Sequence, residues 1–125
     1  MNDTLVLVAE DEAVIALDVA MAIRDAGGKV AGPAASVKQA LALIDTMSIG
    51  GAILDVNLSD GDITPVAQIL LAAGIPTILQ TGVGLPAELV ARFPDLPVQI
   101  KPCASETLVA QLALLIADHQ LSRSG

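Results

Sequence analysis

Four short runs of consecutive apolar residues mark the chain, and each run leads into polar or charged residues. Such runs are typical of strands that are buried on both faces of a parallel sheet. An apolar pair between two glycines predicts one further, shorter strand. The predicted strands are Leu5–Ala9, Val30–Ala31, Ala52–Leu54, Ile75–Leu79 and Val98–Ile100.

Helical patterns fill the segments between these strands. Apolar residues recur there at spacings of three and four, which places them on one face of a helix. Ser36 and Thr64 stand where the N-caps of the second and third helices are expected. Helices are predicted over Glu12–Ala26 and Leu85–Phe93, and around Val37 to Ile44, Val66 to Ala73 and Leu108 to Ile116.

Strand and helix alternate five times with short connections. This order predicts the α/β fold class, with a five-stranded parallel sheet, helices on both faces and right-handed crossovers. The length of 125 residues suits one domain, with a core over about residues 4–119 and a frayed end over residues 120–125. Any output module is therefore expected on another chain.

Composition narrows the range of partners and compartments. The formal net charge of −8 argues against nucleic acid or an anionic membrane as a partner, because phosphate-rich surfaces select basic proteins. The N-terminus lacks a secretory signal, and no apolar stretch reaches about 18 residues. A single cysteine, Cys103, suits a reducing compartment, so we expect a cytoplasmic location. The apolar content of 54% is high enough to permit an apolar surface at which a homodimer could form.

Polar side chains cluster where the predicted strands end. Acidic residues follow the first strand, an aspartate ends the third, a threonine follows the fourth, and a lysine follows the fifth. Ligands of open α/β sheets bind beyond the carboxyl ends of the strands, so we expect these side chains to converge. They are Glu10, Asp11, Glu12, Asp55, Asn57, Thr81 and Lys101.

The chemistry of this set is that of phosphoryl transfer. Mg²⁺ takes one or two carboxylates together with phosphate oxygens, and Asp11 and Asp55 supply carboxylates. A carboxylate can also act as a nucleophile and become an aspartyl phosphate. Lys101 would neutralise charge on the phosphoryl group, and Thr81 would donate a hydrogen bond to it.

Four segments resemble the successive signatures of response-regulator receiver domains: LVLVAEDE, AILDVNLSDG, IPTILQTGVG and VQIKPC. The resemblance covers nearly the whole chain, with each segment in the expected order. It implies the flavodoxin-like strand order 2-1-3-4-5. It also implies a stand-alone receiver that is not an enzyme, accepts a phosphoryl group from a sensor histidine kinase or phosphotransfer protein, and switches binding of a downstream protein.

The resemblance also implies a role for each metal-site residue. Asp55 matches the phosphoacceptor and a metal ligand, and Asp11 matches the direct Mg²⁺ ligand. Glu10 matches the acidic partner that usually works through water. Asn57 would give its backbone carbonyl to the metal.

Three further positions match the residues that engage the phosphoryl group in the family. Thr81 matches the hydroxyl that closes on this group, and Lys101 matches the lysine that pairs with it. Pro102 follows in what is usually a cis peptide bond.

Two departures from the family pattern concern signalling. Val98 stands where typical receivers carry Tyr or Phe, so the usual aromatic switch is missing. The fourth-strand segment resembles a variant subgroup that reads Phe-Ala-Thr-Gly, with Leu79-Gln80 in place of Phe-Ala. The segment from Thr81 to Gly84, followed by residues 85–93, is then the part expected to move on phosphorylation.

Two other functions compete with the leading one. The segment from Asp55 to Ser59 faintly echoes the motif of haloacid-dehalogenase-like phosphatases, although Asn57 replaces its second aspartate. A receiver-like module that binds partners without being phosphorylated is the other alternative. The acidic pair, Asp55 and Lys101 count against it.

Overall fold

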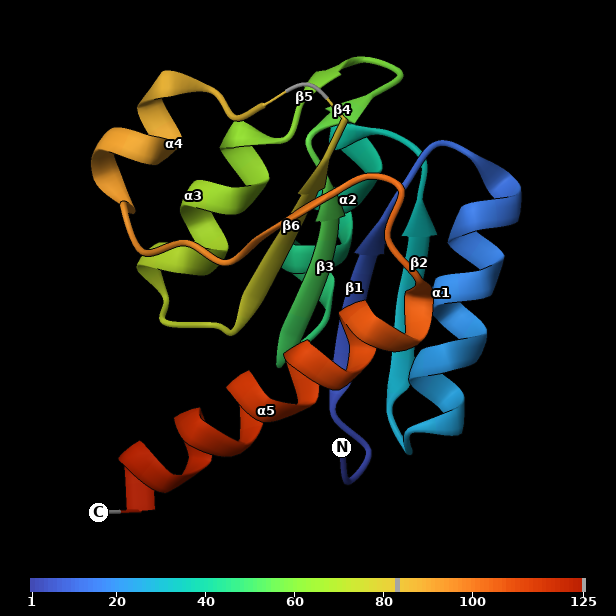
Figure 1. Cartoon of the computed structure of the whole chain (residues 1–125), viewed down its shortest axis with the longest axis vertical. Helices are drawn as coiled ribbons and strands as arrows, with labels where there is room; N and C mark the ends of the chain where they lie inside the picture. Colours follow the sequence, from blue (N-terminus) through green and yellow to red (C-terminus); the bar gives the residue numbers. More distant parts are fainter. Residues whose placement is uncertain (83, 125) are drawn as a thin grey trace.

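The computed structural model describes residues 1–82 and 84–124. Five parallel strands form one sheet in the order β2-β1-β3-β6-β7 (Figure 1). Ranked along the chain, these strands follow the predicted order 2-1-3-4-5, and the α/β fold class is confirmed. Their bounds are β1 (Leu5–Ala9), β2 (Lys29–Ala34), β3 (Gly51–Asp55), β6 (Thr77–Thr81) and β7 (Val98–Ile100).

Helices cover both faces of this sheet (Figure 1). One face carries α1 (Ala13–Asp25) and α5 (Ser105–Ser124), and the other carries α2 (Val37–Thr46), α3 (Thr64–Ala72) and α4 (Ala87–Arg92). Side chains alternate along the strands between two buried cores. Ile53 and Ile78 pack with α1 and α5, whereas Leu54 and Leu79 pack on the opposite face. Burial on both faces explains why the strands read as unbroken apolar runs.

The edge strand β2 is longer than the predicted pair Val30–Ala31. It continues through Gly32 and Pro33 to Ala34, and its register with β1 shifts between Leu7 and Ala9. A proline is tolerated there because an edge strand leaves one row of amide groups outside the ladder. Gly32 has a φ of 100°, which favours glycine. Glycine and proline are uncommon within strands, so the sequence pattern did not predict the second half of β2.

The two predicted N-caps have different outcomes. Ser36 caps α2 as predicted, because its hydroxyl accepts a hydrogen bond from the Gln39 amide at 3.1 Å. The prediction for Thr64 was wrong, since Thr64 is the first residue of α3 and Ile63 occupies the cap position. The carboxylate of Asp62 instead accepts the hydrogen bond of the Thr64 amide at 2.8 Å.

A small hairpin that the sequence analysis did not predict follows Asp55. It pairs β4 (Asn57–Leu58) with β5 (Gly61–Asp62) in antiparallel fashion. At its turn, the Asp60 carboxylate accepts hydrogen bonds from the first amides of α2, at 2.7 Å from Val37 and 3.2 Å from Lys38. A carboxylate is stabilised at a helix N-terminus, so this contact fixes the loop beside Asp55.

The last helix extends further than predicted. Residues 120–124, which were expected to fray, continue α5, and Gly125 lies outside the described residues. Val83, within the segment predicted to move, also lies outside them.

None of the helices within residues 1–82 and 84–124 is long and apolar enough to cross a membrane.

Candidate functional site

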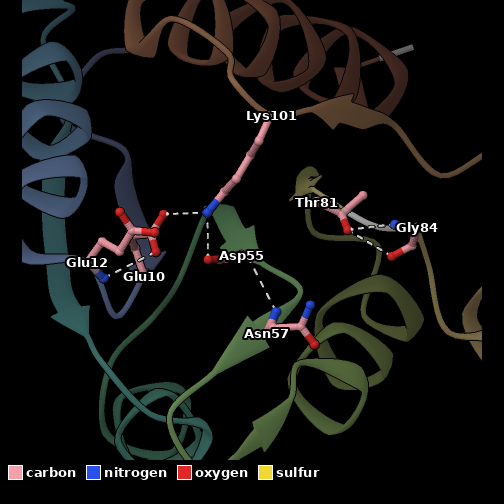
Figure 2. A network of polar contacts seen from close by, with 7 residues as sticks. All are labelled: Glu10, Glu12, Asp55, Asn57, Thr81, Gly84 and Lys101. Atoms are coloured by element: carbon pink, nitrogen blue, oxygen red, sulfur yellow. Dashed lines mark hydrogen bonds and ion pairs between the residues drawn. The ribbon is translucent and has the colours of Figure 1, made fainter.

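Lys101 links two buried carboxylates at the carboxyl edge of the sheet. Its ammonium group lies 2.8 Å from Asp55 Oδ2 and 3.2 Å from Glu10 Oε1 (Figure 2). Glu10 follows β1 and Asp55 ends β3, and these two strands are neighbours in the sheet. Lys101 follows β7, and its long side chain reaches across the end of β6. The predicted convergence of these three residues is therefore confirmed.

Three carboxylates form a cluster beside this lysine. One oxygen each from Glu10, Asp11 and Asp55 lies within 4.8 Å of the others. Glu10 and Asp55 are buried, with 2% and 6% of their surfaces exposed, whereas Asp11 faces solvent. Mg²⁺ prefers oxygen ligands, keeps several waters and needs few carboxylates, so this donor set fits the ion.

Burial and charge shift the titration of two of these groups. Burial raises the pKa of Glu10 from 4.5 to about 7, and the neighbouring Asp55 adds to the rise. The Glu12 amide, 3.3 Å from Glu10 Oε2, and Lys101 oppose the change. Burial alone would lower the pKa of Lys101, but Asp55 and then Glu10 outweigh it, so the pKa lies above its usual 10.5. Lys101 therefore stays cationic at neutral pH.

Both oxygens of Asp55 accept hydrogen bonds. Lys101 donates to Oδ2, and the backbone amide of Asn57 donates to Oδ1 at 3.3 Å. The β4–β5 hairpin fixes the position of Asn57, which pairs with Asp62. The metal-binding role of the Asn57 carbonyl stays a prediction.

Thr81 ends β6 beside the cluster, but its hydroxyl is engaged elsewhere. The hydroxyl donates to the Gly84 carbonyl at 2.8 Å and accepts from the Gly84 amide at 3.0 Å. Figure 2 shows this side chain turned toward Gly84, away from Asp55. Gly84 has a φ of 122°, a conformation that favours glycine. The contact between Thr81 and a phosphoryl group stays a prediction.

The segment around Lys101 matches two further expectations. The Lys101–Pro102 peptide bond is cis. Val98 lies half-buried in β7, and as a valine it supplies no aromatic ring at the position of the usual switch.

Glu10 and Gln80 lie near Asp55 in ways that the sequence did not predict. Glu10 was expected to act through water on the metal, but it also pairs directly with Lys101. Gln80 was noted only as a departure from the subgroup pattern, yet β3 and β6 pair so that it lies beside Asp55. The apolar pattern did not place Gln80, because the fourth strand was predicted to end at Leu79 whereas β6 continues to Thr81.

Sequence-based comparisons find no relatives for this chain. No protein-family model matches it, and no curated protein matches it.

Comparison with solved structures gives clear similarities. SdrG from Sphingomonas melonis Fr1 is 31% identical, with a TM-score of 0.75 over 94% of this chain and 98% of SdrG. The response regulator PhyR from Brucella abortus is 27% identical, with a TM-score of 0.78. That match covers 97% of this chain but only 51% of PhyR, so the chain spans about half the length of that protein.

A more distant structure supports the fold alone. The CheY-like response-regulator receiver domain protein from Methanospirillum hungatei JF-1 is 19% identical and superposes with a TM-score of 0.83. The superposition covers 96% of this chain and 98% of the Methanospirillum chain. Together with the strand order and the convergence of Asp55, Lys101 and the acidic pair, these similarities show that the chain belongs to the family of response-regulator receiver domains.

Proposed function

We propose that this chain is a stand-alone receiver of a two-component phosphorelay and that Asp55 is its phosphoacceptor. The observation that carries the proposal is the 2.8 Å contact between Lys101 Nζ and Asp55 Oδ2 inside a cluster of three carboxylates. A carboxylate held next to a permanent cation at a strand end can act as a nucleophile toward an incoming phosphoryl group. The charge that this group brings is stabilised by the same cation.

The transfer follows from the positions of the side chains. An oxygen of Asp55 attacks phosphorus, the bond from phosphorus to the donor breaks, and the electron pair of that bond leaves with the donor. Lys101, which reaches Asp55 from β7, would shift its ion pair to a phosphoryl oxygen. Thr81 would exchange its bond to Gly84 for a bond to another phosphoryl oxygen.

The acidic cluster would hold Mg²⁺ through Asp11 and Asp55, with Glu10 in support. When bound, the ion supplies positive charge to the phosphoryl oxygens. The neighbouring carboxylates of Glu10 and Asp55 repel each other, and a bound cation would relieve this repulsion. The backbone carbonyl of Asn57 would complete the protein ligands.

The partners follow from the same assignment. A sensor histidine kinase or a phosphotransfer protein would donate the phosphoryl group, and a downstream protein would recognise the phosphorylated form. The net charge of −8 disfavours nucleic acid and anionic membranes as partners. We expect this signalling domain to act in the cytoplasm.

Two alternatives were considered for this site. The similarity to the response regulator PhyR favours a signalling domain over a haloacid-dehalogenase-like phosphatase. A receiver that binds partners without phosphorylation differs from our proposal only in whether Asp55 is labelled.

Labelling with a small phosphodonor tests the proposal. The protein and its Asp55→Asn variant are incubated with acetyl phosphate and Mg²⁺, and intact mass is measured. We expect the mass of one phosphoryl group to be added to the parent protein and not to the variant. Equal labelling of the two proteins, or no labelling of either, would contradict the assignment.

A further inference from the structure

The side chain of Gln80 is buried beside the phosphoacceptor without a protein partner. Only 2% of its surface is exposed. Within residues 1–82 and 84–124 its carboxamide makes no hydrogen bond to another protein group, although the Gln80 carbonyl accepts one from the Val56 amide. Among the described residues only the Thr64 hydroxyl is fully buried without a partner, so the Gln80 amide meets the pocket that this residue lines and can donate a hydrogen bond there.

The strand register places Gln80 next to Asp55 on the same face of the sheet. The two residues are direct partners in the β3–β6 ladder. Each follows a leucine, Leu54 or Leu79, that packs on the opposite face, so both side chains point toward α1 and α5. Adjacent strands lie about 4.8 Å apart, a distance that a glutamine side chain can span.

A pocket borders the side chain of Gln80. Gln80 and Lys101 line a pocket of about 770 Å³ between α1 and the segment that leads into α5, together with Ile15 and Cys103. Gln99 in β7 is the ladder partner of Gln80 on its other side. Among the described residues, and unlike Gln80, Gln99 has a protein partner for its side-chain amide, which donates a hydrogen bond to Gln111 of α5 at 2.5 Å.

We propose that Gln80 is a catalytic residue for hydrolysis of the aspartyl phosphate, an inference that rests on the proposed phosphorylation of Asp55. In that reaction, water attacks phosphorus and the bond from phosphorus to the Asp55 oxygen breaks. The electron pair of this bond remains on the Asp55 carboxylate, and the proton of the water passes to inorganic phosphate. Gln80 Nε2 donates a hydrogen bond to the carboxylate oxygen as its negative charge develops, which favours the transition state over the ground state.

The test follows the decay of the phosphorylated protein. Asp55 is phosphorylated with acetyl phosphate and Mg²⁺, the donor is removed, and loss of the phosphoryl mass is followed over time. In Gln80→Met the side chain keeps its volume but loses its donor, and we expect decay to slow roughly tenfold. This is less than the roughly 100-fold typical of a lone oxyanion donor, because Lys101 shares the developing charge. Gln99→Met is the matched control and should decay at the parent rate.

The direction of the change separates catalysis from structure. A merely structural role would loosen the wall around Asp55, admit water and accelerate decay. Gln80→Leu repeats the test if Gln80→Met does not fold, as judged by its melting curve. Decay of the Gln80 variants at or above the parent rate overturns this inference alone. Absence of labelling in the parent protein overturns it together with the proposed function.

Discussion

Replacing Glu10 by glutamine should remove a pH-dependent loss of stability from the protein. Burial, followed by the proximity of Asp55, raises the pKa of Glu10 in the folded chain from 4.5 to about 7. A group whose pKa is raised by folding stabilises the fold while protonated, and this contribution is lost as the pH rises from 4.5 through 7. The folded protein without metal should therefore become less stable over this range.

The size of the effect follows from the pKa change. At about 1.36 kcal/mol per pKa unit, a rise from 4.5 to about 7 corresponds to about 3 kcal/mol. That figure is an upper bound on the difference between pH 5 and pH 8, because the unfolded carboxyl is already mostly ionised at pH 5 and part of the contribution is lost below that pH. Hydrogen bonds from Val37 and Thr64 lower the pKa values of Asp60 and Asp62, and the pKa of Lys101 is raised. These three groups therefore titrate outside the window.

Urea unfolding in the presence of EDTA measures this difference. The chain has no Trp or Tyr, so far-ultraviolet circular dichroism is the appropriate signal. We expect the free energy of unfolding to fall by up to about 3 kcal/mol from pH 5 to pH 8 in the parent and to stay nearly flat in Glu10→Gln. Glu12→Gln, at an exposed position next to the cluster, should keep the parent slope. Parallel pH profiles for the parent and Glu10→Gln would refute the reasoning.

Two further substitutions probe the metal and the switch. Asp11→Asn should slightly raise the melting temperature without metal, by relieving carboxylate repulsion, and weaken Mg²⁺ binding by more than roughly tenfold in a calorimetric titration, since even outer-shell changes cost that much. Unchanged Mg²⁺ affinity would remove Asp11 from the site. Thr81→Ala should still be phosphorylated, but its hydrogen exchange over residues 84–93 should no longer respond to beryllofluoride, because the hydroxyl that can leave Gly84 for the phosphoryl group is gone. A response equal to that of the parent would show that another segment carries the signal.

The parts of the site that could be predicted are those fixed by strand ends. Leu5–Ala9 and Ala52–Leu54 are unbroken apolar runs, and a parallel sheet brings their carboxyl ends to one edge. The positions of Glu10 and Asp55 follow from that arrangement alone. Lys101 could be placed as well, because its strand ends at the same edge and its side chain is long.

Features set by non-local hydrogen bonds could not be predicted. The β4–β5 hairpin is only two residues long on each side and depends on Asp60 contacting the start of α2, 23 residues away. The orientation of the Thr81 hydroxyl depends on the backbone of Gly84. The position of Gln80 beside Asp55 depends on the register of β3 against β6, which apolar pattern alone does not fix to one residue.

Mapping the phosphoryl group to a residue tests the central claim most directly. The protein is treated with acetyl phosphate and Mg²⁺ and then reduced with borohydride, which converts an aspartyl phosphate to homoserine. Peptide mass spectrometry then locates the reduced residue. Our account predicts homoserine at position 55, where Asp55 meets Lys101 at 2.8 Å, and at no other position. Reduction at Asp11 instead, or recovery of intact Asp55 in every peptide, would contradict it.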